Sequence, residues 1–195
     1  PFGRPKTIAL PEPFGTHEQY IIPHPEPVTL SKSLAHKGVR LVEARGTWPP
    51  RNMRLLKALH EFGFLRNDEI EMQGARFGIL DAVARYLVQA PEGSTTELYG
   101  YALHVEVAGQ RDGRRFRHVL TNGHPPSDGS VEDWAGLRAY TRSVGIPMSI
   151  GAQLIAKGKA RRTGAVAPEN AFDPQEFFDE LKKRRIYVNA RIMQG

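Results

Sequence analysis

Residues 99–124, YGYALHVEVAGQRDGRRFRHVLTNGH, carry the clearest secondary-structure signal in the chain. Apolar side chains alternate with small or polar ones along residues 99–107, which is the period of a β-strand with one apolar face. Asp112-Gly113 is a favoured two-residue turn, and the alternation resumes at Phe116. The stretch therefore predicts a long antiparallel hairpin.

Helical periodicity and short strand-like runs lie on both sides of this hairpin. The expected helices are 51–62, 79–89, 132–144, 147–157 and 174–184, and the further expected strands are 38–44 and 186–192. Gly145 is expected to end one helix, Pro147 to begin the next, and Asp173 to cap the last. The fold class is α+β, with a mixed, largely antiparallel sheet and helices packed on one face.

The chain divides by composition into three parts. Residues 1–36 are rich in proline, so extended segments and turns are expected rather than helices. Residues 37–145 hold the hairpin and form the α+β domain, and residues 146–195 form a C-terminal helical segment. At 195 residues the chain is long enough to bury a core of its own.

Composition excludes several classes of protein. The net charge is +6, but the basic residues are spread out or placed at helix ends, where the helix dipole favours them, so no nucleic-acid partner is expected. The chain has no cysteine, which excludes disulfides and thiolate metal sites. No apolar run approaches the roughly 20 residues that span a bilayer, so we expect a cytoplasmic protein with no membrane partner.

Motifs of self-contained enzymes are absent from the sequence. There is no GxGxxG turn, no GxxxxGK[ST] loop, no GxSxG elbow and no HExxH helix, so no cofactor is expected to bind these residues. The tightest metal-ligand combination joins His17 and Glu18 to His24 and Glu26. Because a proline-rich segment holds ligands poorly, no metal site is expected there.

Two groups of polar side chains are candidate site residues. His104 and His118 could face each other across the hairpin, either as a cross-strand pair or as a pocket wall that moves protons. Arg45, Thr47 and Trp48 follow the 38–44 strand, where an arginine could hold a carboxylate. Equally, Trp48 could fill the core while Arg45 is solvated.

Two further polar residues of interest lie on the return strand of the hairpin and on the helix after it. Asn122, on the return strand of the hairpin, joins the candidate pocket residues. Arg142 is interpreted as a surface residue of the helix before Gly145.

Residues 141–188 hold a series of landmarks in a specific order. Gly145-Ile146-Pro147 is followed by Gly158, by residues 164–169 with the sequence GAVAPE, and by Phe177-Phe178. This order resembles the C-terminal end of the saccharopine dehydrogenase family. Residues 39–65 and the HPEPVTL segment at 24–30 resemble upstream parts of the same family. The sequence departs from the family at Ala44-Arg45-Gly46, where Tyr-Pro-Gly is usual.

The resemblance implies an oxidoreductase that acts on the amine of an amino acid. It implies NAD or NADP bound by a Rossmann half that these residues lack, with residues 37–145 serving substrate binding and dimerisation and residues 146–195 packing back on that half. A homodimer and an amino-acid substrate are expected. Arg45 would bind the carboxylate of the substrate, and a histidine would assist proton transfer to or from the amine. The chain, which starts at Pro1, is expected to begin inside a longer protein and to be inactive alone. The alternative is a non-catalytic assembly module that retains the family fold.

Overall fold

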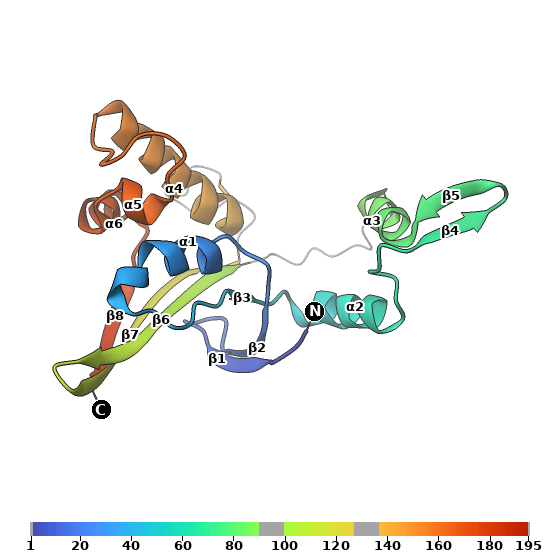
Figure 1. Cartoon of the computed structure of the whole chain (residues 1–195), viewed down its shortest axis with the longest axis horizontal. Coiled ribbons are helices and arrows are strands. Elements are labelled where there is room, and N and C mark those ends of the chain that lie inside the picture. Colours follow the sequence, from blue (N-terminus) through green and yellow to red (C-terminus); the bar gives the residue numbers. More distant parts are fainter. Residues whose placement is uncertain (1, 90–99, 127–136, 195) are drawn as a thin grey trace. The chain divides into compact units, whose positions relative to one another are not determined.

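The computed structural model describes residues 2–89, 100–126 and 137–194, which form an α+β protein as predicted (Figure 1). The strands are β1 (Lys6–Ala9), β2 (Thr16–Ile21), β3 (Arg45–Gly46), β4 (Glu69–Met72), β5 (Ala75–Gly78), β6 (Tyr101–Arg111), β7 (Arg114–His124) and β8 (Asn189–Gln194). The helices are α1 (Glu26–Ser33), α2 (Pro50–Glu61), α3 (Ile79–Gln89), α4 (Ala139–Ala156), α5 (Pro168–Ala171) and α6 (Pro174–Lys183), with a 3-10 helix, η1, at Ala35–Lys37.

These elements form three small antiparallel sheets within two compact units. The strand orders are β1-β2-β3, β4-β5 and β6-β7-β8. Of the described residues, the first unit takes 2–6, 18–23 and 44–89, and the second takes 7–17, 24–43, 100–126 and 137–194. The second unit holds the long hairpin and the C-terminal helices.

The predicted hairpin is confirmed as β6 and β7. The strands pair from Tyr101 opposite His124 to Arg111 opposite Arg114. Asp112 and Gly113 make the turn with φ angles of 52° and 74°, which is the left-handed geometry of a two-residue hairpin loop. The predicted final strand is present as β8, which pairs antiparallel with β7. It begins three residues later than the predicted position 186, because Ile186 is buried in the core instead.

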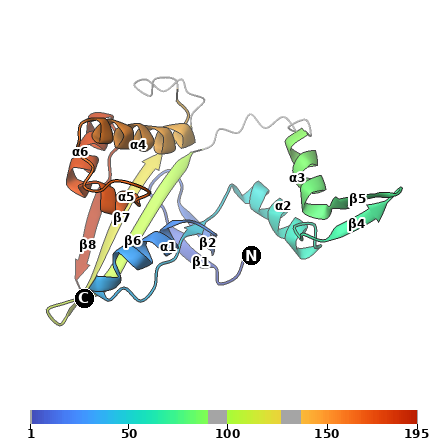
Figure 2. The ribbon, with the colours of Figure 1, turned by 45° about the horizontal axis from the view of Figure 1, so that its top comes forward.

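The main core of the second unit lies between α4 and α6, which are side by side in both views of the ribbon (Figures 1 and 2). It consists of Ile150, Leu154, Leu181 and Ile186. As predicted, Asp173 caps α6, where its carboxylate accepts hydrogen bonds from the backbone N–H groups of the residues two and three positions later. This cap fixes where the apolar face of α6 begins.

The predicted break between Gly145 and Pro147 is wrong, because α4 runs through both residues without interruption. A proline inside a helix costs about 3 kcal/mol through its missing N–H and its clash with the preceding turn. Burial of Ile150 and Leu154, which follow it, contributes about 1.5 to 3 kcal/mol each and outweighs that cost. Residues 132–136 of the predicted helix lie outside the described residues.

The prediction that residues 1–36 contain no helix is also wrong, because α1 begins at Glu26. Pro25 is its N-cap, and Pro27 falls in the first turn. The backbone N–H groups of a first turn have no partner within the helix, so a proline there removes no hydrogen bond. The prolines of this segment therefore start a helix rather than prevent one.

The strand predicted over 38–44 does not form, and only Arg45 and Gly46 pair with β2. Strand-like residues need a neighbouring strand, and two of the three large apolar residues of this run, Val39 and Leu41, are 39% and 72% exposed. In the first unit, α2 and α3 are confirmed close to their predicted bounds. The β4-β5 hairpin was not predicted, because its Gln73-Gly74 turn lacks the asparagine or aspartate that usually marks one.

Candidate functional site

Arg45, Thr47 and Trp48 lie at the exit of β3 in the first unit. The Arg45 guanidinium donates through Nη1 to the main-chain oxygen of Arg4 at 2.6 Å and, more weakly, to that of Gln19 at 3.4 Å. Trp48 is 51% exposed, so the alternative in which it fills the core is wrong. The exit thus presents an anchored guanidinium close in sequence to an exposed indole.

A second polar cluster, formed by Glu18, Tyr20 and Lys57, belongs to the same unit. The Tyr20 hydroxyl donates to Glu18 Oε2 at 2.5 Å, and Lys57 Nζ lies 3.7 Å from that oxygen and 4.7 Å from the centre of the Tyr20 ring. Hydrogen bonding with Tyr20, and further the charge of Glu18, raise the pKa of Lys57, so the lysine is a cation at neutral pH. Alternation along β2 places Glu18 and Tyr20 on one face, while Arg45 pairs opposite Ile21 on the other.

The Glu18–Tyr20–Lys57 cluster was missed in the sequence. Its signal is the Glu18-x-Tyr20 spacing on a strand, which puts a carboxylate and a phenol on one face. The lysine comes from α2, more than thirty residues away in the chain, and only the tertiary fold of the first unit brings it near.

His104 and His118 lie on opposite faces of the hairpin, so the prediction that they face each other is wrong. The register pairs His104 with Thr121 and His118 with Val107. His118 therefore shares the face of the apolar row, where its ring packs edge-on against Phe116 with centroids 5.2 Å apart. His104 lies on the other face, with its Nε2 3.9 Å from Glu106 Oε2.

Asn122 is buried at the far end of the same hairpin and has a structural partner. It is 7% exposed, and its Nδ2 donates to the main-chain oxygen of Tyr187 at 2.8 Å. This bond ties β7 to the segment that leads into β8. Asn122 shares its face of β7 with His118, four positions away, but not with His104 on β6.

Arg142 is 2% exposed, so its interpretation as a surface residue is wrong. Its Nη2 donates to the main-chain oxygen of Arg184 at 2.5 Å, which joins α4 to the end of α6. This burial could not be predicted from the sequence, since a charged residue on an amphipathic helix usually faces water.

His124 is equally buried, at 2% exposure, opposite Tyr101 in the sheet. Burial, and next the positive charge of Arg142, lower the pKa of His124 to about 4, so the imidazole is neutral at pH 7. Burial likewise lowers the pKa of Arg142 and, together with Tyr140 and Glu26, raises the pKa of Tyr101. Asn122, His124 and Arg142 form a second group of buried polar side chains, in which Asn122 bonds the segment before β8 and Arg142 joins α4 to the end of α6.

A metal site and a dinucleotide site each require a characteristic arrangement of residues. Among the residues that the structure describes, no three histidine, aspartate or glutamate side chains gather in a metal-binding arrangement. A dinucleotide fold needs parallel strands with a glycine-rich strand-to-helix turn, whereas the sheets of the described ranges are antiparallel. These residues do not fit NAD or NADP. Within the same ranges, no helix is both long enough and apolar enough to cross a membrane.

Comparison with known proteins identifies the family. None of the curated proteins matches the chain. The model of one family, the saccharopine dehydrogenase C-terminal domain, matches residues 2–186, which is nearly the whole chain and includes both polar clusters and the β6-β7 hairpin. The resemblance seen in the sequence is therefore confirmed, and the chain belongs to the saccharopine dehydrogenase C-terminal domain family.

Proposed function

We propose that this chain is the substrate-binding part of an NAD(P)-dependent dehydrogenase that acts on the amine of an amino acid. The observation that carries the proposal is the family match over residues 2–186. The family consists of amino-acid dehydrogenase-like enzymes that generally depend on NAD(P). Because the described residues do not fit a dinucleotide, the cofactor would be held by a nucleotide-binding half elsewhere in the full-length protein. The proposed location is the cytoplasm.

Arg45 is the group that we assign to a substrate carboxylate. A planar guanidinium forms two parallel hydrogen bonds with a carboxylate, which gives direction as well as charge. The bonds from Nη1 to Arg4 and Gln19 hold the side chain in one position before the substrate arrives. Thr47 and the exposed Trp48 extend the same surface with a hydroxyl group and an aromatic face. The exit of β3 therefore supplies the binding surface of the proposed site.

His104 is the better of the two histidines for proton transfer to or from the amine. It lies near a carboxylate, Glu106, which can orient the imidazole. His118, in contrast, packs against Phe116 among apolar residues. Asn122 remains a proposed pocket residue, although its amide already bonds Tyr187.

A homodimer is the proposed assembly, formed through the apolar face of the β6-β7-β8 sheet. This face exposes Leu103, Val105, Val107 and Ile192, at 44%, 48%, 54% and 61%. Alternation puts all four on one side of the sheet, with His118 between Val107 and Ile192. Contiguous apolar surface of this kind marks an interaction site, and a two-fold axis would cover it with the same face of a second copy.

The alternative is a non-catalytic assembly module that keeps the family fold. The hydrogen bonds of Arg45 and Asn122 favour the assembly module. Both side chains already donate to main-chain oxygens, so fewer of their donors are available to a ligand. The usual Tyr-Pro-Gly of the family is also replaced at Ala44-Arg45-Gly46. An assembly module would retain the apolar sheet face and lose the turnover of substrate.

The experiment that separates these functions is a screen of the full-length protein with NAD and NADP. Lysine, saccharopine and related diamino acids are offered as substrates, and the ultraviolet absorbance of reduced nicotinamide is followed. Substrate-dependent reduction of either cofactor would support the dehydrogenase. A folded protein that binds the cofactor but reduces it with none of these amino acids would contradict the proposed substrate class and favour the assembly module.

A further inference from the structure

We propose that a groove over the β6-β7 hairpin binds a small molecule that carries two or more carboxylate or phosphate groups. The groove has a volume of about 640 Å³ and is lined by three arginines, Arg40, Arg115 and Arg117. The remaining lining residues are Ala108, Gly109, Gln110, Phe116 and Met193. None of them is acidic, so the lining presents only positive charge and neutral groups.

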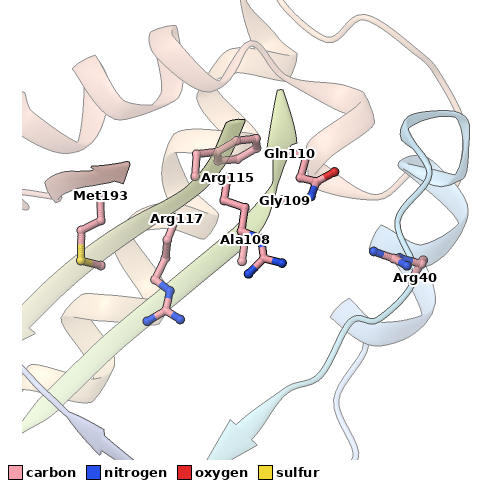
Figure 3. A pocket seen from close by; sticks show the side chains of 8 residues that line it. Arg40, Ala108, Gly109, Gln110, Arg115, Arg117 and Met193 are labelled. Atoms are coloured by element: carbon pink, nitrogen blue, oxygen red, sulfur yellow. The ribbon is translucent and has the colours of Figure 1, made fainter. Parts of the chain in front are cut away.

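The sheet register explains why the arginines gather there. Arg115 and Arg117 are two positions apart on β7, so their side chains leave the same face of the sheet about 7 Å apart. Gln110 lies opposite Arg115, while Ala108 and Met193 lie on either side of Arg117. Figure 3 shows both arginines extending from β7, with Arg40 on the loop across the groove.

The charges of the groove are only partly compensated. Arg117 Nε lies 3.4 Å from Glu106 Oε1 on the neighbouring strand. No described residue forms an ion pair with Arg40 or Arg115. Three guanidinium groups that line one groove, with a single carboxylate beside them, repel one another, and an anion between them would relieve that repulsion.

The chemistry of the lining sets the class of ligand. Guanidinium groups bind carboxylates and phosphates through paired hydrogen bonds, and three of them require a ligand with more than one such group. The small residues Ala108 and Gly109 leave room over the strand, and Gln110 adds a neutral amide donor. Met193, which pairs with Arg117 and shares its face, offers apolar contact to a carbon skeleton. The volume lies within the range of about 300 to 1,000 Å³ that is typical of small-molecule sites.

The test is calorimetric titration of the full-length protein with two probes, inorganic pyrophosphate and citrate. Saturable binding of either probe is expected, and the tighter of the two identifies phosphate or carboxylate as the preferred group. Arg115→Gln and Arg40→Gln should each weaken binding about tenfold, because each removes a charged hydrogen-bond donor. Glu106→Gln should tighten binding, because it removes the acidic neighbour of Arg117.

The matched control is Arg114→Gln. Arg114 precedes Arg115 on β7, carries the same charge and is exposed, but it points to the opposite face and does not line the groove. It should change affinity less than about threefold, through long-range charge alone. Absence of saturable binding by both probes, or equal losses in Arg114→Gln and Arg115→Gln, would overturn the proposal. Because the groove is tested by binding and not by turnover, its failure is distinct from failure of the proposed dehydrogenase.

Discussion

The Arg142 guanidinium donates a hydrogen bond through Nη2 to the main-chain oxygen of Arg184 at 2.5 Å, joining α4 to the C-terminal end of α6. Arg142 is 2% exposed, so its replacement leaves the half-buried carbonyl of Arg184 without this donor. We expect Arg142→Met, which keeps the apolar stem, to lower the free energy of unfolding by about 2 to 3 kcal/mol. Urea unfolding measures the change.

Arg138→Met is the control for this prediction. Arg138 is the N-cap residue of α4, one turn before Arg142, and it is exposed. The substitution removes the same charge and should change the free energy of unfolding by less than about 0.5 kcal/mol. Equal effects of the two substitutions would mean that the bond to Arg184 contributes nothing.

His124 should make the stability of the protein depend on pH. Its folded-state pKa of about 4 lies below the ordinary value of 6.5, so the folded protein resists protonation of the imidazole. This contribution is complete above the unfolded pKa and is lost as the pH falls through about 4. A shift of this size corresponds to about 3 kcal/mol. We expect His124→Gln to reduce the loss of unfolding free energy between neutral and acidic pH.

Two comparisons make the His124 prediction specific. His36 is exposed on η1, and His36→Gln should leave the pH dependence as it is in the parent protein. Arg142→Met should raise the pKa of His124, seen by NMR titration of the imidazole, because the charge of Arg142 helps to lower it. An imidazole of His124 that titrates near 6.5 in the parent protein would contradict the prediction.

Two glycines of the second unit should respond to alanine with opposite signs. A Cβ at Gly100 would lie 2.5 Å from Phe14 Cε1 and 2.9 Å from the main-chain oxygen of His124, so Gly100→Ala should destabilise the fold by about 1 to 3 kcal/mol. A Cβ at Gly145 would meet nothing within 4 Å inside α4. Gly145→Ala should therefore stabilise the fold by about 0.5 to 1 kcal/mol. Thermal unfolding of both variants checks the two signs together.

The sequence predicts secondary structure well where the pattern depends only on residues close together in the chain. The alternation over 99–107 and the Asp112-Gly113 turn gave β6 and β7 correctly. The two-residue turn also sets the register, and this register puts His104 and His118 on opposite faces of the hairpin, contrary to the prediction that they face each other. The continuous helix α4 could not be predicted, because proline is tolerated at position 147 only when the residues beyond it find a partner in α6.

The candidate site was less predictable than the fold, because its contacts depend on residues far apart in the chain. Arg45 is recognisable as a residue at a strand exit, but its bonds to Arg4 and Gln19 depend on how β2 and the N-terminal residues pack. Arg142 was predicted to lie on the surface, but it is buried. The helical period indicates which residues share one face of a helix, but it does not indicate which face packs against the rest of the protein. Long-range packing decides both cases.

The apolar face of the β6-β7-β8 sheet should be required for the proposed dimer. Val105 lies within this face and is 48% exposed. We expect Val105→Asp to convert a dimer of the full-length protein into monomers, because two-fold packing would bury the two carboxylates against apolar groups. Light scattering after size-exclusion chromatography measures the mass. Gln110→Asp, on the opposite face of β6, should leave the dimer intact; a Val105→Asp protein that remains dimeric would exclude this face as the interface.

Arg45 should control substrate affinity rather than the rate of the chemical step. In the full-length protein, Arg45→Ala should raise KM for the amino acid about tenfold to a hundredfold and leave kcat nearly unchanged, because a carboxylate contact is present in both the ground state and the transition state. Arg51→Ala, an exposed arginine of α2, is the control for charge and should leave KM unchanged. Because Arg45 also bonds Arg4 and Gln19, cofactor affinity and unfolding are measured alongside the kinetics. A raised KM with normal cofactor binding and stability indicates a contact with the substrate, whereas unchanged KM assigns Arg45 to the fold alone.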